Sequence, residues 1–294
     1  TNLPHPPFFA DPRNIDRFDP DRLALPASYY RETFEDKPAF QRTRIANDDG
    51  VGPDERASRE LLAKYYSMIA AADEHCKTII EQFKRLGLWD NTIVLFFSDH
   101  GDMMNAHRLR VKGTLPYDEV YRIPCILKLP AGVEPQRETV DDLVSSVSLP
   151  GTLMQAAGLE VPNEMTGGSV YEAVFRHEHP PDEAVFFEHY GAHWGVHPFY
   201  GVRTREHKYV RYYGPDDTEE MYHLGEDPLE LTNVAFDPAC EAAKRSLATR
   251  ADAWWERTGG RSYEYYESDW FRSNRHNTAG PLSETQYACG PYWK

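Results

Sequence analysis

Hydrophobic positions recur at intervals of three and four residues between Pro53 and Gly87. This spacing predicts a long amphipathic helix that ends near Gly87, a residue suited to a helix C-cap. The apolar members of the pattern are Leu61, Leu62, Tyr65, Met68, Ile69, Ala72, Ile79, Phe83 and Leu86. A continuous apolar run, Thr92–Phe97, follows, and predicts a strand buried on both faces of a parallel sheet. A helix followed by a buried strand is typical of the α/β class.

Further elements follow from the same patterns. Dense prolines exclude long helices from residues 1–56. The run Ile123–Leu129 predicts a second strand, and residues 139–158 predict a helix that ends near Gly158. After residue 180, four short aromatic runs separated by turn residues predict an antiparallel sheet. Residues 239–258 return to helical spacing, and we expect this helix to cover that sheet.

Composition excludes several classes of protein. The 294 residues are 40% hydrophobic and 27% charged, which argues against a disordered chain. A net charge of −15 opposes binding to nucleic acid or to anionic membrane surfaces. No apolar run is long enough for a membrane span, and no export signal is present, so the sequence indicates no subcellular location. The four cysteines show no paired spacing that predicts a zinc cluster.

Polar residues collect where the Thr92–Phe97 strand ends, which is where ligands bind in open α/β sheets. Asp99 and His100 are adjacent, and the turn allowed by Gly101 would let both serve one divalent cation. The alternative is that Asp99 caps a helix and His100 is a buried imidazole with ordinary hydrogen bonds.

Several cationic or titratable residues follow in the polar loop 105–113, including His107 and Lys112. Local positive charge in an acidic chain suits an anionic substrate such as a sulfate or phosphate ester. Plain solvation of these side chains is the alternative. His5 lies among Pro4, Pro6 and Pro7, which restrict its backbone and suit either proton transfer or a structural role.

Three segments resemble the sulfatase family of the alkaline-phosphatase superfamily. SDHGDMMNAHRLRVKGTLPYDEVYRIPCILKLPAG is similar to the family's signature block, and PHPPFFADP resembles its PHxPF segment. YGVRTREHKYVRYYGPDDTEEMYHLGEDPLELTNVA is similar to its C-terminal subdomain, so the resemblance extends from residue 4 to about 258. It implies part of an alkaline-phosphatase-like α/β sandwich plus a small C-terminal antiparallel sheet packed with a helix. It also implies hydrolysis of sulfuric esters.

The resemblance implies roles for individual residues. Asp99 and His100 match metal ligands, with Ca²⁺ the expected ion and Mn²⁺, Mg²⁺ or Zn²⁺ the alternatives. Lys112 matches the lysine that binds sulfate oxygens, and His5 matches the histidine that protonates the leaving group. His107 matches a histidine near the pocket, with a role in substrate binding or in support of the site. Asn105 stands where the signature usually has glycine.

One part of the family pattern is absent. Sulfatases carry a [CS]-x-P-x-R motif that is converted to formylglycine, and none of Cys76, Cys125, Cys240 or Cys289 lies in such a motif. A paired-Asp metal motif on an apolar strand is also absent before residue 56. We therefore expect the carboxyl-terminal portion of a longer polypeptide, weakly active or inactive without its amino-terminal half. That half is an expected partner, and formylglycine is expected only there.

The domain organisation follows from the resemblance. Residues 1–180 are expected to belong to the large α/β catalytic domain, 181–260 to a small α+β subdomain, and 261–294 to a tail. In the small subdomain, Trp194, His197 and Arg203 belong to a polar-aromatic cluster that would bind the substrate, a small-molecule or carbohydrate sulfate ester. A hydrophobic core is the alternative for that cluster.

Two other functions are compatible with these residues. Phosphate or phosphonate monoester hydrolases of the same superfamily share the SDHG block, and a metal plus Lys112 would bind a phosphoryl group equally well. A noncatalytic binding module with a sulfatase fold is the other alternative, favoured by the missing nucleophile and opposed by the retained site residues.

Overall fold

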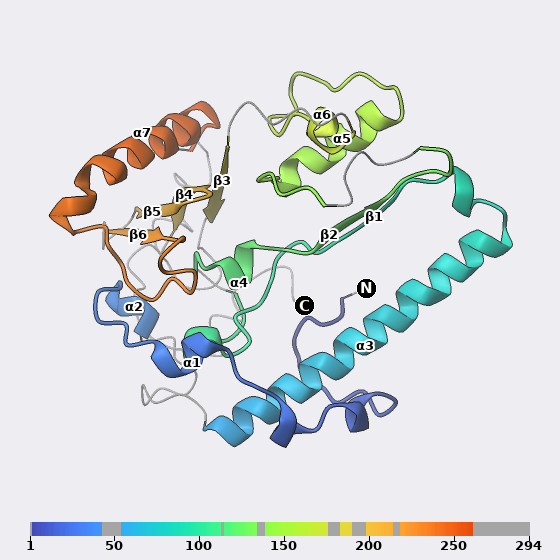
Figure 1. Ribbon diagram of the computed structural model, residues 1–294, viewed down its shortest axis with the longest axis horizontal. Coiled ribbons are helices and arrows are strands. Elements are labelled where there is room, and N and C mark those ends of the chain that lie inside the picture. Colours follow the sequence, from blue (N-terminus) through green and yellow to red (C-terminus); the bar gives the residue numbers. More distant parts are fainter. Residues whose placement is uncertain are drawn as a thin grey trace, which may run out of the picture. The chain divides into compact units, whose positions relative to one another are not determined.

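The structure, a computed structural model, describes residues 2–42, 54–112, 115–133, 139–175, 183–189, 198–213 and 218–260 (Figure 1). The chain forms two compact units, the first made of Thr1–Glu32, Arg44–Lys112 and Tyr117–Glu134, and the second of Thr33–Thr43, Gly113–Pro116 and Pro135–Lys294. In the described residues the helices are α1 (Ala27–Arg31), α2 (Ala39–Arg42), α3 (Glu55–Arg85), α4 (Asp118–Tyr121), α5 (Leu149–Ala156), α6 (Tyr171–Phe175) and α7 (Glu241–Arg257). The strands are β1 (Val94–Phe97), β2 (Cys125–Lys128), β3 (Ala184–His189), β4 (Phe199–Thr204), β5 (His207–Tyr212) and β6 (Glu219–His223). Short 3-10 helices are η1 (Ile15–Arg17), η2 (Pro20–Arg22), η3 (Trp89–Asn91), η4 (Ala106–Arg108), η5 (Ser146–Ser148) and η6 (Pro238–Cys240).

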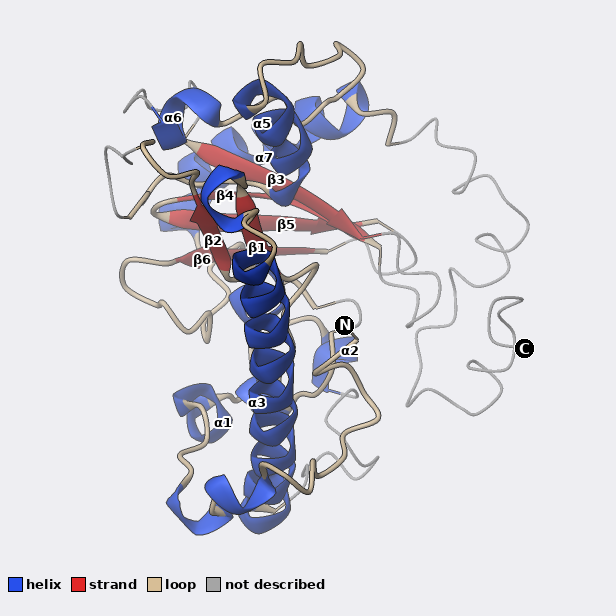
Figure 2. Ribbon diagram, turned by 90° about the vertical axis from the view of Figure 1, so that its right-hand side faces the viewer, coloured by secondary structure: helices blue, strands red, loops and turns tan. Residues whose placement is uncertain are grey.

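The helix α3 confirms the prediction from the three- and four-residue spacing. The Asp54 carboxylate caps it by accepting a hydrogen bond from the backbone N–H of Ala57 at 2.8 Å. Gly87 follows the helix with φ +69°, the left-handed conformation expected of a C-cap glycine. Figure 2 shows α3 as one long rod in the first unit. Within the described part of the chain, no helix combines the length and apolarity needed to cross a bilayer.

The strand β1 begins two residues later than predicted, and its surroundings differ from the expectation. It pairs with β2 in antiparallel orientation, with Val94 opposite Lys128 and Phe97 opposite Cys125. Phe96 remains 47% exposed, and Ile126 on β2 remains 63% exposed. The prediction of a parallel strand buried on both faces is therefore wrong for the residues described. An apolar run predicts that a strand is buried, but the path of the connecting chain decides whether the paired strand runs parallel or antiparallel to it.

The predicted helix over 139–158 is shorter than expected. Helix α5 begins at Leu149, with Pro150 in its first turn. Proline lacks the N–H that an interior helical position donates, so a helix running from residue 139 through Pro150 would lose a hydrogen bond. The end near Gly158, which has φ +75°, agrees with the prediction.

The second unit confirms the predicted antiparallel sheet and its covering helix. Strands β3, β4, β5 and β6 pair in that order, each antiparallel to its neighbour. Helix α7 packs on this sheet (Figure 1), and Trp255 stacks on Tyr200 with ring centroids 4.3 Å apart. Leu247 and Ala251 lie in the same core, as the helical spacing predicted. The proposed boundary between domains at residue 180 stays a prediction.

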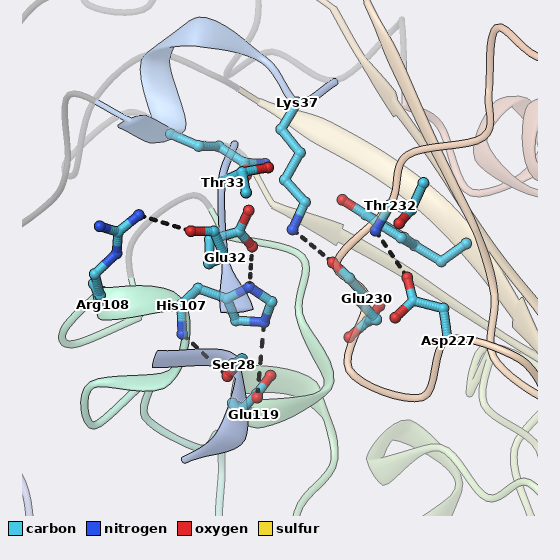
Figure 3. A network of polar contacts seen from close by, with 12 residues as sticks. Ser28, Glu32, Thr33, Lys37, His107, Arg108, Glu119, Asp227, Glu230 and Thr232 are labelled. Atoms are coloured by element: carbon cyan, nitrogen blue, oxygen red, sulfur yellow. Dashed lines mark hydrogen bonds and ion pairs between the residues drawn. The ribbon is translucent and has the colours of Figure 1, made fainter. Parts of the chain in front are cut away.

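A buried charged network also lies in the second unit. The Lys208 ammonium lies 2.6 Å from a carboxylate oxygen of Glu230, and both side chains are 1% exposed. Lys208 also donates to the carbonyl oxygen of Pro116 at 3.1 Å. Lys37 donates to the carbonyl oxygen of Glu230 at 2.5 Å (Figure 3). Because these ammonium groups have close acceptors, the charges are tolerated in the core.

Candidate active site

The candidate site begins where β1 ends, in the first unit. Asp99 and His100 follow the last strand residue by two and three positions. Gly101 then donates its N–H to the carbonyl oxygen of Val120 at 2.7 Å. A Cβ atom at Gly101 would lie 1.9 Å from the carbonyl oxygen of Glu119, so only glycine fits this turn. This close approach, rather than a special φ angle, explains why glycine follows the two candidate ligands.

The His100 ring is oriented by a backbone contact at Nδ1. Its Nδ1 lies 2.8 Å from the carbonyl oxygen of Gly101. A carbonyl oxygen only accepts hydrogen bonds, so Nδ1 carries the proton and Nε2 of the neutral ring has the lone pair. That Nε2 lies 3.8 Å from Oδ2 of Asp99, whose side chain is 86% exposed. Two candidate ligand atoms, one on an exposed carboxylate and one on a half-buried ring, therefore lie beside each other.

This pair fits a divalent cation. Two atoms bound to one ion at about 2.0–2.5 Å each lie roughly 3–4 Å apart, which matches the separation of His100 Nε2 and Asp99 Oδ2. The hydrogen bond at Nδ1 is the support that metal-bound histidines usually have. The described residues contain no group of three or more His, Cys, Asp or Glu that could hold an ion.

Lys112 and His5 lie in contact, although they are far apart in sequence. Nζ of Lys112 is 2.7 Å from Nε2 of His5. Nδ1 of His5 is 2.8 Å from the carbonyl oxygen of Pro6, so Nδ1 donates and Nε2 accepts from the ammonium. The rings of His5 and His100 approach edge to face, with centroids 6.4 Å apart. His5, Asp99, His100 and Lys112 thus form one cluster, which we call the polar cluster.

The segment that carries His5 packs on α3. Phe8 contacts Tyr65 edge to face with centroids 5.9 Å apart, and both belong to the periphery of a small hydrophobic core. The N–H of His5 donates to the carbonyl oxygen of Asn2 at 2.7 Å. Burial, followed by the charge of Asp102, raises the pKa of Tyr65 to about 12, so this phenol stays protonated at neutral pH.

Lys112 follows a loop with an unusual backbone, residues 103–111, which we call the lysine loop. Five of its residues have positive φ without being glycine, namely Met104, Asn105, His107, Arg108 and Val111. Each costs on the order of 1 kcal/mol, and the cost is larger for a β-branched residue such as Val111. Asn105, with φ +73°, occupies the left-handed conformation that the family's usual glycine would adopt freely.

His107 is enclosed rather than open to solvent. Its side chain is 0% exposed and stacks on Tyr117 with centroids 4.1 Å apart. Nδ1 contacts the carboxylate of Glu32, and Nε2 lies 3.9 Å from Glu119 Oε1 (Figure 3). This burial favours support of the site over direct contact with a substrate, and its role in substrate binding stays a prediction.

Asp102 lies beside the polar cluster, although no sequence motif assigns it a role. Its Oδ1 accepts hydrogen bonds from the backbone N–H groups of Met104 at 2.9 Å and Val111 at 3.2 Å. Burial raises the pKa of Asp102, against the effects of these hydrogen bonds and the charge of Lys112. Burial lowers the pKa of Lys112, and the carboxylates of Asp102 and Asp99 oppose that shift. The sequence feature that could have indicated Asp102 is its position as an acidic residue directly after the SDHG motif.

The remaining predicted substrate-binding residues belong to the second unit. Trp194 and His197 lie outside the described residues. Arg203 lies on β4 opposite Val185 of β3, and its guanidinium donates to the carbonyl oxygen of Thr204 at 3.3 Å. The contribution of these three residues to substrate binding stays a prediction.

Comparison with known proteins identifies the family. The sulfatase family profile matches residues 4–159, which is more than half of the chain. The chain belongs to the sulfatase family. A second profile, N-sulphoglucosamine sulphohydrolase, C-terminal, matches residues 107–256. The matches confirm the resemblance, and sulfatases generally depend on a divalent metal.

Among characterised sulfatases, the chain is 27% identical over 181 residues to an N-acetylglucosamine-6-O-sulfatase of Bacteroides thetaiotaomicron, covering 60% of the chain and 32% of that protein. It is 30% identical over 191 residues to arylsulfatase K of Bos taurus, covering 62% of the chain and 34% of that protein. The chain thus matches about a third of the length of these sulfatases.

Solved structures confirm the fold. One neighbour, an enzyme in complex with its substrate D-glucosamine-2-N,6-O-disulfate, has a TM-score of 0.72 at 20% identity, covering 92% of this chain and 65% of that one. A phosphonate monoester hydrolase from Silicibacter pomeroyi has a TM-score of 0.71 at 23% identity, covering 86% of this chain and 54% of that one. These neighbours show that the sulfatase chain has the α/β fold that the sequence predicted.

Proposed function

We propose that the polar cluster is part of an active site that hydrolyses sulfate monoesters. The observation that carries this proposal is the 2.7 Å contact between Lys112 Nζ and His5 Nε2, beside the Asp99–His100 pair. An acidic chain repels sulfate, so a site for it needs locally placed positive charge. Lys112 is a donor that can hydrogen-bond the nonbridging oxygens of the ester.

His5 is the proposed proton donor to the leaving oxygen. Its neutral ring accepts a hydrogen bond from Lys112, so it acts as an acid only after Nε2 gains a proton. That proton would come from solvent, so Lys112 would keep its ammonium charge and turn from Nε2 to the nonbridging oxygens of the ester. The proton would then pass from Nε2 to the departing alkoxide or phenolate, while Nδ1 remains bound to the carbonyl oxygen of Pro6.

Asp99 and His100 are the proposed metal ligands, with Ca²⁺ as the expected ion. A divalent ion there would stabilise negative charge on the sulfate oxygens. Calcium usually takes about 6–8 oxygen ligands, so these two residues alone would bind it weakly. Oxygen ligands outside the described pair, together with the nucleophile, are proposed to come from an amino-terminal sulfatase segment that carries Cys-x-Pro-x-Arg.

The substrate is proposed to be a carbohydrate or aryl sulfate. The names of the characterised relatives, an N-acetylglucosamine-6-O-sulfatase and arylsulfatase K, support this class. Trp194 would stack on a sugar or aryl ring, and Trp194→Ala is expected to change the preference among sulfated substrates. Equal kinetics on several such substrates would contradict that role.

The test compares this chain alone with the chain combined with such an amino-terminal segment, using an aryl sulfate as substrate. We expect turnover only in the combination, and a loss of about 10²–10³-fold in kcat for Lys112→Ala. Exposed Arg245→Ala is the matched control that removes a positive charge from α7. Wild-type rates in Lys112→Ala and Asp99→Ala would refute the assigned roles.

The same assay separates the alternatives. Sulfate, phosphate and phosphonate esters of one phenol are compared at equal concentration. Preference for the phosphorus esters would replace the proposal by phosphoryl or phosphonate ester hydrolysis. Sulfate binding without turnover in any combination would indicate a noncatalytic module.

A further inference from the structure

The lysine loop has a role that no motif indicates. We infer that Asp102 is a positioning residue for Lys112, and that the buried pair His107–Glu32 fixes the middle of the same loop. This inference rests on the proposed function, because it explains how the sulfate-binding lysine is held towards His5.

Hydrogen bonds join the two ends of the lysine loop beside Lys112. The N–H of Met103 donates to the carbonyl oxygen of Val111 at 2.8 Å. Oδ1 of Asp102 also accepts from the N–H groups of Met104 and Val111. One carboxylate oxygen therefore ties the start of the loop to its last residue, and Lys112 is the next residue in the chain. Its Cα position depends directly on this closure.

The middle of the lysine loop, residues 105–108, is fixed by buried polar contacts. The N–H of His107 donates to Oγ of Ser28 at 3.1 Å, and its ring contacts the Glu32 carboxylate (Figure 3). The Arg108 guanidinium donates to the carbonyl oxygen of Glu32 at 2.8 Å. Asn105 donates to the carbonyl oxygen of Ser58 in α3 at 3.2 Å. These contacts come from α1 and its flank and from α3, so they hold the loop against the rest of the first unit.

These contacts also explain how the loop keeps its strained backbone. Left-handed φ angles at five non-glycine residues would relax in a loop without such anchors. Strain that persists at a candidate active site indicates a geometry that the surroundings enforce. The enforced loop geometry fixes the position of Lys112, which follows the loop and contacts His5.

Asp102 also contributes charge. Lys112 and His100 lie close enough for its carboxylate to interact with both electrostatically, and the phenol of Tyr65 in α3 also interacts with it electrostatically. Asp102→Asn keeps an oxygen that can accept the two N–H bonds but removes the charge. Asp102→Ala removes both. Comparison of the two variants therefore separates loop closure from electrostatics.

The first measurement follows the His5–Lys112 hydrogen bond by ¹⁵N NMR of the imidazole in the intact chain. We expect wild type and Asp102→Asn to show His5 with Nδ1 protonated and Nε2 as acceptor, and Asp102→Ala to lose the Nε2 hydrogen-bond shift. Glu32→Gln is expected to change the same signal in the same direction. Asp90→Asn, an exposed residue of η3, is the control for loss of one carboxylate.

The second measurement is sulfate binding by titration calorimetry, on the chain combined with the amino-terminal segment of the proposed function. Asp102→Ala is expected to weaken binding about tenfold or more, as for loss of one charge-assisted hydrogen bond. Thermal melting checks folding, and Leu247→Ala in α7 serves as a variant destabilised elsewhere that should leave the His5 signal unchanged. An unchanged His5 signal and sulfate affinity in folded Asp102→Ala would overturn the inference.

The two proposals fail differently. If wild type combined with the amino-terminal segment binds no sulfate, while Asp102→Ala still loses the His5 signal, the proposed function is wrong and the positioning role holds. If wild type binds sulfate and Asp102→Ala binds it equally well with an intact His5 signal, the positioning role is wrong and the proposed function stands.

Discussion

The ammonium nitrogen of Lys112 lies 2.7 Å from Nε2 of His5, across 107 residues of sequence. The contact joins a proline-rich segment near the start of the chain to the end of the lysine loop. Because an ammonium only donates, Nε2 of His5 is the acceptor in this contact. Under the proposed function, an ester oxygen bound here would meet a hydrogen-bond donor and a ring that can receive and pass on a proton.

Metal binding should depend on Asp99 and His100. We expect Ca²⁺ to bind weakly to the chain, and Asp99→Asn and His100→Gln each to weaken binding about tenfold or more, because each removes one of few ligands. Titration calorimetry with Ca²⁺, Mn²⁺, Mg²⁺ and Zn²⁺ measures this, with Asp90→Asn as control. Unchanged affinity in both ligand variants would place the metal elsewhere.

Gly101→Ala should disturb the site through the backbone. Its new methyl group would lie 1.9 Å from the carbonyl oxygen of Glu119, so the turn must shift. We expect a loss of roughly 1–3 kcal/mol in the free energy of unfolding, together with weaker metal binding. Gly225→Ala, where the nearest atom is His223 Cε1 at 3.4 Å, is the control and should melt close to wild type.

The buried ion pair Lys208–Glu230 should contribute strongly to the stability of the second unit. Lys208→Met leaves the Glu230 carboxylate buried without its closest ammonium, and we expect a loss of about 3–5 kcal/mol in unfolding free energy. Urea denaturation measures the change. Arg245→Met removes an exposed charge from α7 and should cost less than about 1 kcal/mol. Similar stability of the two variants would show that the buried pair contributes little.

Acid should destabilise the second unit through His207. Burial, and then the neighbouring ring of His223 at 4.7 Å, lower the pKa of His207 below its ordinary value of 6.5. The nearby carboxylate of Glu206 acts in the opposite direction. The unfolded chain therefore binds this proton more tightly than the folded one. Stability should fall as the pH drops through 6.5 towards the lower folded pKa.

Thermal melting between about pH 8 and pH 5 tests this dependence on either side of the ordinary histidine pKa. His207→Gln should show a flatter dependence than wild type, whereas His75→Gln, exposed on α3, should not. Equal slopes for wild type and His207→Gln would contradict the shift assigned to His207.

Several elements of the fold were accessible from the sequence, because their signals are local. The three- and four-residue spacing and the C-cap residue Gly87 predicted α3 and its end, and aromatic runs between turns predicted strands β3 to β6. The residues of the polar cluster were also accessible, since SDHG, Lys112 and the proline-bracketed His5 each lie in a short motif.

The tertiary structure decided what depends on distant segments. The direction of β2 beside β1, and the exposure of Phe96, follow from how the chain returns, which an apolar run does not encode. The enclosure of His107 by Glu32 and Tyr117 required residues from α1's flank and from the segment before α4. The role of Asp102 depends on its hydrogen bond from the N–H of Val111, nine residues later, and such a bond forms only where the fold brings the two residues together.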